Sequence, residues 1–206
     1  PKIIVALSLL IPMTFLFLFH LLNKGYPVFW DSLDYMMEAQ KHYLVFESKG
    51  FWAALHSAYL DRHPRAILHP IFLMPALIAS GGDILKSNAF SMMFLFGIFL
   101  VYLFLLLRVY LRPQYAALGV LFIGSLPWTL QTAYFCNSEL FLMTAVVAFL
   151  FHAVKLEKFQ NLPHTIACAA WAGLAICFRP VEGFFNLWFP MILLFMAGRK
   201  NKPRLL

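Results

Sequence analysis

Three carboxylates near the N-terminus stand at helical spacing. Asp31, Asp34 and Glu38 lie at positions i, i+3 and i+7, which share one face of a helix. Such a cluster beside a membrane could bind a divalent cation such as Mg²⁺ or Mn²⁺ through its oxygen atoms, and one carboxylate could act as a general base. The alternative interpretation is an amphipathic helix at the membrane surface, with Asp31 capping its first turn.

A basic segment follows further along the chain. Residues 61–69 contain two arginines and two histidines, among which Arg62, Arg65 and His69 suit an anionic group. Arginine forms bidentate hydrogen bonds to phosphate, and histidine can donate a proton to a leaving oxygen. The alternative is an ordinary solvated loop broken by prolines.

A third set of charges stands at the margins of apolar segments. Glu139 comes early in one segment, and Arg179 and Glu182 separate two later ones. Charges at the margin of a membrane helix are costly unless they are paired or line a wet cavity, which makes them candidates for function. The alternative is a structural pair of Arg179 with Glu139 or Glu182, or side chains that extend to the membrane surface.

Long apolar helices must position these residues. Of 206 residues 62% are hydrophobic and 12% are charged, against about 45–50% and 25% in soluble domains. Six helices of about 20 residues would account for this excess. The sequence therefore predicts a single all-α polytopic membrane module over residues 1–206. The predicted spans are residues 3–22, 88–107, 115–131, 135–154, 163–178 and 184–197.

Residues 23–87 are predicted to form a long first extracytoplasmic loop that carries amphipathic helices. Within it, residues 71–79 are apolar but too short to cross a bilayer, which predicts a surface-lying or re-entrant segment. Because the first residue is Pro1 and the last five form a basic stub, we expect the chain to be the N-terminal part of a longer protein.

The net charge of +7 indicates orientation and not nucleic-acid binding. Long apolar segments separate the basic residues, whereas a nucleic-acid binder concentrates them on one solvated face. Threading six spans places most of them in the short loops of one side, with one acidic residue among them. The positive-inside rule makes this side, which holds both termini, cytoplasmic. Three cysteines without CxxC or Cys/His spacing predict neither a zinc site nor a disulfide framework.

In this order and sidedness, the polar motifs resemble the GT-C superfamily of polytopic glycosyltransferases. The protein mannosyltransferase and lipid A aminoarabinose transferase families are the most similar branches. The matching elements are Asp31-Ser32-Leu33-Asp34-Tyr35 with Ala39, His69-Pro70 to Pro75, Asn88, Ser138-Glu139, Gly173-Leu174-Ala175, and Arg179-Pro180-Val181-Glu182-Gly183. The acidic motif departs from the family pattern, since two residues separate Asp31 from Asp34, and this leaves open which carboxylate is the base.

The resemblance implies transfer of a sugar from a polyprenyl-phosphate donor to a hydroxyl of a glycan, lipid or protein acceptor. The reaction would take place at the outer face of a membrane, the bacterial inner membrane in preference to the endoplasmic reticulum, with inversion. Asp31 would be the base, and Asp34 would assist it or bind a divalent cation with it. The donor phosphate would be neutralised by Arg62, Arg65, His69 or Arg179, and the substrate cavity would be lined by Tyr35, Glu38, Glu139 and Glu182.

Two other classes of function compete with this interpretation. In a polytopic transporter or channel, Glu139, Arg179 and Glu182 would line a substrate path, although transporter sites lie near the membrane midplane and these charges gather at one face. A non-catalytic membrane subunit would instead pack against a partner protein.

Overall fold

The computed structural model describes residues 2–23, 30–60, 68–135, 138–156, 161–179, 183–184 and 186–188, and these contain helices and no strand. The helices are α1 (Lys2–Leu22), α2 (Trp30–Lys49), α3 (Phe51–Leu60), α4 (His69–Ala79), α5 (Ile84–Tyr110), α6 (Pro113–Gly124), α7 (Pro127–Tyr134), α8 (Ser138–Val154) and α9 (Leu162–Phe178). The all-α prediction is thus confirmed for the described residues.

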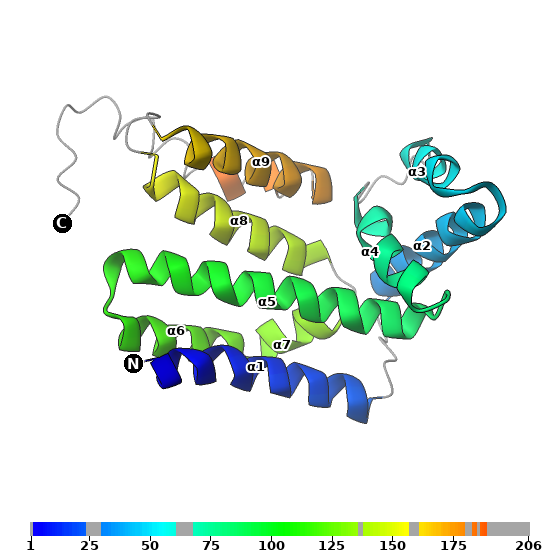
Figure 1. Ribbon diagram of the computed structural model, residues 1–206. Coiled ribbons are helices and arrows are strands. Elements are labelled where there is room, and N and C mark those ends of the chain that lie inside the picture. The colour runs from blue at the N-terminus through cyan, green and yellow to red at the C-terminus, as the bar shows by residue number, and fades with distance from the viewer. Residues whose placement is uncertain are drawn as a thin grey trace.

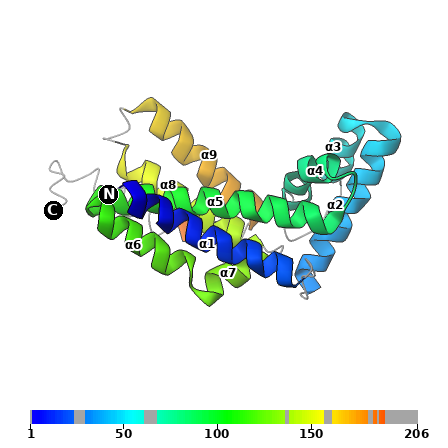
Figure 2. The ribbon, with the colours of Figure 1, turned by 60° about the horizontal axis from the view of Figure 1, so that its bottom comes forward.

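The helices divide into two regions, which we call the bundle and the cap. The bundle consists of α1 and α5–α9, with α5 in contact with α1, α6, α7 and α8. The cap consists of α2, α3 and α4, which gather at one end of the bundle in both views (Figures 1 and 2). At about 1.5 Å per residue, the 27 residues of α5 extend about 40 Å, which exceeds the hydrocarbon core of about 30 Å. The first turns of α5 therefore reach the cap, where they pack on α4.

Fewer helices than predicted are long enough to cross a membrane. Helices α1 and α5 meet the length and hydropathy expected of a span, and α6 with α7 would make a third if the pair is one bent span. These helices indicate an integral membrane protein, but six spans are not supported. Helices α8 and α9 have 17 residues each, about 25 Å, slightly less than the hydrocarbon thickness. The predicted sixth span, 184–197, lies almost entirely outside the described residues.

The third predicted span, 115–131, is broken. Helix α6 ends at Gly124 and α7 begins at Pro127, and the two axes differ by 64°. Proline lacks a backbone N–H and is favoured in the first turn of a helix, so Pro127 starts a new helix and does not continue the old one.

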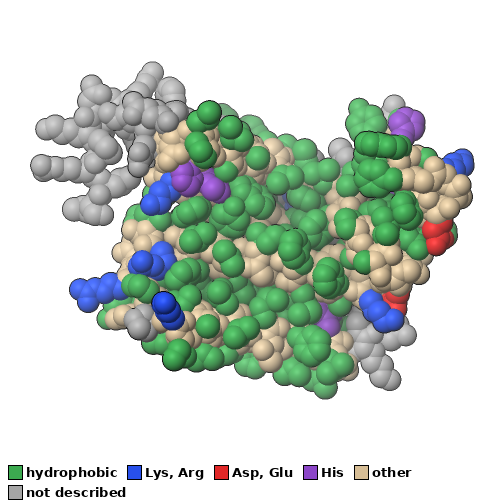
Figure 3. All heavy atoms as spheres, in the orientation of Figure 1, with side chains coloured by type: hydrophobic (Ala, Val, Ile, Leu, Met, Phe, Trp, Pro, Cys, Tyr) green, Lys and Arg blue, Asp and Glu red, His purple; other side chains and the backbone are tan. Residues whose placement is uncertain are grey.

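The bundle packs through small residues. Ala116, Ala117 and Gly124 of α6 are buried, and a Cβ at Gly124 would lie 2.7 Å from Leu100 of α5 and 3.1 Å from Pro12 of α1. Small residues let helix backbones approach closely, which drives helix association in lipid. Large apolar side chains cover much of the outer surface in the view of Figure 3.

The two ends of the bundle carry different charges. The start of α1, the end of α5, the start of α6 and the end of α8 meet at the end away from the cap (Figure 1). Lys2, Arg108, Arg112 and Lys155 lie at or beside these helix ends, whereas Asp83 lies at the cap end of α5. In the view of Figure 3, acidic side chains are seen only at the cap end, whereas lysine and arginine side chains are seen at both ends.

Candidate functional site

An arginine–glutamate pair joins α8 and α9 at the cap end of the bundle. Arg179, the C-cap residue of α9, donates from Nη2 to Oε1 of Glu139 over 2.6 Å and from Nε to Oγ of Ser138 over 2.7 Å. Ser138 and Glu139 are the first two residues of α8. The side chains of Arg179 and Glu139 remain 20% and 33% exposed, so neither is sealed inside the bundle.

The glycine of the Arg-Pro-x-x-Gly pattern has a steric role beside this pair. The backbone N–H of Gly183 donates to the carbonyl oxygen of Arg179. A Cβ at position 183 would overlap the carbonyl oxygen of Ala175 and lie 2.9 Å from the backbone nitrogen of Ile176. Only glycine permits this contact with the last turns of α9.

Aromatic rings connect the arginine–glutamate pair to the cap. Phe178 precedes Arg179, and its ring stacks on Phe141 of α8 with centroids 4.1 Å apart. Phe72 of α4 packs edge-on against Phe141 at 4.7 Å. The helix that follows the predicted basic segment is thereby held against the arginine–glutamate pair. Stacked and edge-to-face pairs of this kind contribute about 0.5–1.5 kcal/mol beyond their buried area.

The carboxylates predicted to share a face do lie on one helix. Helix α2 begins at Trp30, so Asp31 is in its first turn and Asp34 and Glu38 follow at helical spacing. Asp34 is exposed and Glu38 is half-buried. Tyr35, predicted to line the substrate cavity, is buried in the main hydrophobic core, where it holds α2 in place.

Several predicted site residues fall outside what the structure describes. These are Arg62, Arg65, Glu182 and the side chains of Asp31 and His69. Their roles, and the distance from Asp31 to Arg179 or Arg62, stay predictions. Among the described residues no three His, Cys, Asp or Glu side chains are grouped closely enough to hold a metal ion. A magnesium or manganese site likewise stays a prediction.

Two buried polar side chains lie near the same end of the bundle. Asn88, which the sequence singled out, is 1% exposed in the second turn of α5, and His20 is buried near the end of α1 against the ring of Tyr134. Within the described part of the chain, neither side chain has a hydrogen-bond partner. Buried polar groups are normally paired, so these two mark places where the bundle can accept polar contacts.

The structure forms the pair of Arg179 with Glu139 that the sequence offered as one structural alternative. The hydrogen bond from Arg179 to Ser138 and the ring contact of Phe72 were not predicted. Ser138 contributes through its hydroxyl to the position of Arg179, and Phe72 through its ring to the position of the cap. No spacing in the sequence links residue 138 to residue 179, because the two meet only through the antiparallel packing of α8 on α9. No protein-family model, curated protein or solved structure matches the chain.

Proposed function

We propose that this chain forms part of a membrane glycosyltransferase of the GT-C kind. It would move a sugar from a polyprenyl-phosphate donor to an acceptor hydroxyl at the outer face of the membrane. The observation that supports the proposal is the arginine–glutamate pair of α8 and α9, which lies at the same end of the bundle as the acidic helix α2. An anionic leaving group and a base for the acceptor are the two requirements of the reaction, and this end carries residues suited to both.

The reaction is a single displacement. The acceptor oxygen forms a bond to the anomeric carbon as the bond from that carbon to the phosphate oxygen breaks. Asp31, or Asp34, takes the acceptor proton, and the polyprenyl phosphate leaves with the electron pair. Because the acceptor attacks from the face opposite the leaving group, the anomeric configuration inverts.

Arg179 would stabilise the phosphate as it leaves. In the resting arrangement Glu139 holds one terminal nitrogen of the guanidinium and Ser138 holds Nε. A dianionic phosphate competes well for arginine because it accepts bidentate hydrogen bonds. A donor aimed at developing negative charge contributes about 3–4 kcal/mol to such reactions. Arg62, Arg65 and His69 are the further candidates for the same charge, and Glu38 and Glu182 would surround the sugar. Tyr35, which the sequence also assigned to the cavity, is buried in the core and would hold α2 in place.

The proposal implies a membrane topology for the helices. Helices α1, α5, α6 with α7, α8 and α9 would cross the membrane, with residues 184–197 as the sixth span. The end with Lys2, Arg108, Arg112 and Lys155 would face the cytoplasm, with the cap in the periplasm of a bacterial cell. If Mg²⁺ or Mn²⁺ takes part, Asp31 and Asp34 would hold it.

Turnover of polyprenyl-phosphate sugar by the protein in membranes tests the proposal. We expect Asp31→Asn, Asp34→Asn or both to lower the rate by about 10²–10⁴, the usual contribution of a general base. Glu47→Gln is the matched control, because Glu47 lies on the same helix and accepts a hydrogen bond from Tyr43 instead. Undiminished turnover in both aspartate variants would refute the base assignment, and absence of any sugar transfer by the wild type would refute the function.

A further inference from the structure

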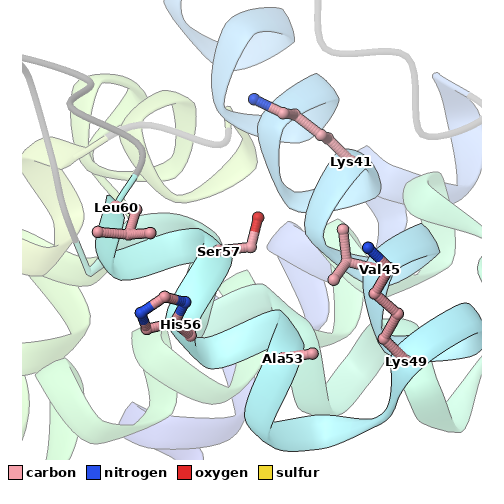
Figure 4. A pocket seen from close by; sticks show the side chains of 7 residues that line it. All are labelled: Lys41, Val45, Lys49, Ala53, His56, Ser57 and Leu60. Carbon is pink, nitrogen blue, oxygen red and sulfur yellow. The ribbon is translucent and has the colours of Figure 1, made fainter.

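A second polar site lies in the cap, in a groove between α2 and α3. The groove has a volume of about 510 Å³. Lys41, Val45 and Lys49 line it from α2 at i, i+4 and i+8. Ala53, His56, Ser57 and Leu60 line it from α3. Figure 4 shows the Ser57 hydroxyl directed away from α3 into the open space, with Lys41, Val45 and Lys49 along α2.

A tight turn and a buried hydrogen bond hold the two helices of the groove together. Gly50 alone connects α2 to α3, and its φ of +83° is the left-handed conformation that glycine adopts at low cost. The two helices are also joined by His42, which is 1% exposed and whose Nδ1 lies 3.1 Å from Oγ of Ser57. This hydrogen bond sets the position of the Ser57 hydroxyl at the groove.

The lining of the groove is basic. Its ionisable members are two lysines and a histidine, and no carboxylate belongs to the described lining. Glu47, the acidic residue nearest to Lys49 in sequence, accepts a hydrogen bond from the Tyr43 hydroxyl over 2.8 Å. Lysine ammonium groups are suited to a phosphate group. The Ser57 hydroxyl can donate to it as well in the His42 tautomer whose Nδ1–H donates to Oγ of Ser57.

The other side of α3 is apolar. Phe51, Ala54, Leu55 and Ala58 line a groove of about 440 Å³ between α3 and α4, together with Ile71, Met74, Pro75 and Ile78. At 100° per residue, this set lies opposite the basic set on α3. Trp52 and Tyr59, which are 78% and 75% exposed, lie between the two sets on one face. A polar side, an aromatic stripe and an apolar side in succession are typical of a helix at a membrane surface.

We infer that α3 lies at the outer surface of the membrane and that the basic groove binds the phosphate of an anionic glycerophospholipid. The headgroup phosphate contacts Lys41, Lys49, His56 and Ser57. Trp52 and Tyr59 lie at the level of the headgroups. Because α5 is longer than the hydrocarbon core and packs on α4, the cap can lie at the depth that this contact requires. The inference does not depend on sugar transfer.

The protein in lipid nanodiscs tests the inference. Native mass spectrometry would count phosphatidylglycerol molecules retained against phosphatidylcholine. We expect Lys41→Gln and Lys49→Gln each to weaken phosphatidylglycerol retention about fivefold, the effect of one basic residue beside an anionic membrane. Lys86→Gln is the matched control, since Lys86 is a cap-side lysine outside the groove that pairs with Asp83. Equal retention in the groove variants and the control would overturn the inference.

Fluorescence separates a lipid headgroup from a free phosphate ion. The difference in emission between wild type and Trp52→Phe isolates Trp52, and phospholipids with brominated acyl chains should quench it. Inorganic phosphate at millimolar concentration is the second probe, in phosphatidylcholine discs. Phosphate-dependent stabilisation that Lys49→Gln removes, without quenching of Trp52, would identify a site for soluble anions and overturn the lipid assignment.

Discussion

Helix α1 of the bundle and helix α2 of the cap differ in the side chains that they bury. In α1, Ser8 and His20 are buried while leucines such as Leu10 are more than half exposed. In α2, Met36 and Ala39 are buried while Lys41 is exposed. Each helix has one side against the protein, but the exposed side of α1 is apolar and that of α2 is mixed with charge.

The difference indicates that the two helices lie in different solvents, α1 in lipid and α2 in water. A helix in lipid gains little from burying leucine, since lipid chains are equally apolar. The bundle buries large side chains such as Phe96 together with small residues such as Gly124, which let its helices approach closely. A helix in water gains from every apolar side chain that it removes from solvent, so the cap folds around Tyr35, Met36 and Leu77. The arginine–glutamate pair lies where the two regions meet.

The largest expected effect is at that junction. Gly183→Ala would place a Cβ against the backbone of Ala175, and we expect it to cost about 3 kcal/mol or more. Gly173→Ala is the matched control, because a Cβ at Gly173, inside α9, has nothing within 4 Å. It should be neutral or stabilising by up to about 1 kcal/mol. Unfolding in mixed micelles measures both, and similar losses would show that position 183 is not confined.

The next prediction compares the cost of placing a lysine on the exposed side of α1 with its cost on the exposed side of α2. Leu10→Lys puts a charge on the exposed side of α1, which should cost about 3 kcal/mol of membrane insertion. Leu44→Lys, at an equally exposed leucine of α2, should change stability by less than about 0.5 kcal/mol. A glycosylation-based insertion assay and thermal unfolding are the measurements. A large loss for Leu44→Lys would mean that this face of α2 also contacts lipid.

A smaller effect is expected at the arginine–glutamate pair itself. Arg179→Met removes the hydrogen bonds to Glu139 and Ser138 and should cost about 2 kcal/mol. In a double-mutant cycle with Glu139→Gln, the two losses should be less than additive because the residues share one interaction. Additive losses would mean that the pair contributes nothing to the packing of α8 on α9.

The smallest effect is at the start of α5. Asp83 caps this helix by accepting a hydrogen bond from the backbone N–H of Lys86, so Asp83→Ala should cost about 1 kcal/mol. Hydrogen bonds from the side chain and backbone of Lys86 lower the pKa of Asp83 below its ordinary 3.8. The stabilisation is therefore complete above about pH 4 and lost as the pH falls through the lowered pKa.

Asparagine at position 83 separates the effect of the helix-capping hydrogen bond from the effect of the negative charge. Asp83→Asn keeps an acceptor for the N–H of Lys86 but cannot titrate. It should retain most of the stability at pH 7 and lose the dependence on acid pH. Thermal unfolding at pH 7 and pH 3 checks this, and an unchanged acid dependence would assign the effect to other carboxylates.

By itself the sequence determined the local features of this protein. Long charge-free segments predicted α1 and α5, and the spacing of Asp31, Asp34 and Glu38 placed them on one face of α2. The sequence also predicted the basic end of the bundle. These features depend on residues close together in the sequence and on the solvent around each helix. The amino-acid composition and the spacing of apolar and charged residues are enough to predict them.

Only the tertiary structure decided which distant residues meet. It formed the pair of Arg179 with Glu139 that the sequence offered as one alternative, and it added Ser138 to that pair. It buried Tyr35 and opened a groove between Lys41 and His56. It also broke the predicted third span into α6 and α7. Each outcome depends on the angle and depth at which two helices pack. Many side chains together determine this packing geometry, and it cannot be read from the spacing of residues along the chain.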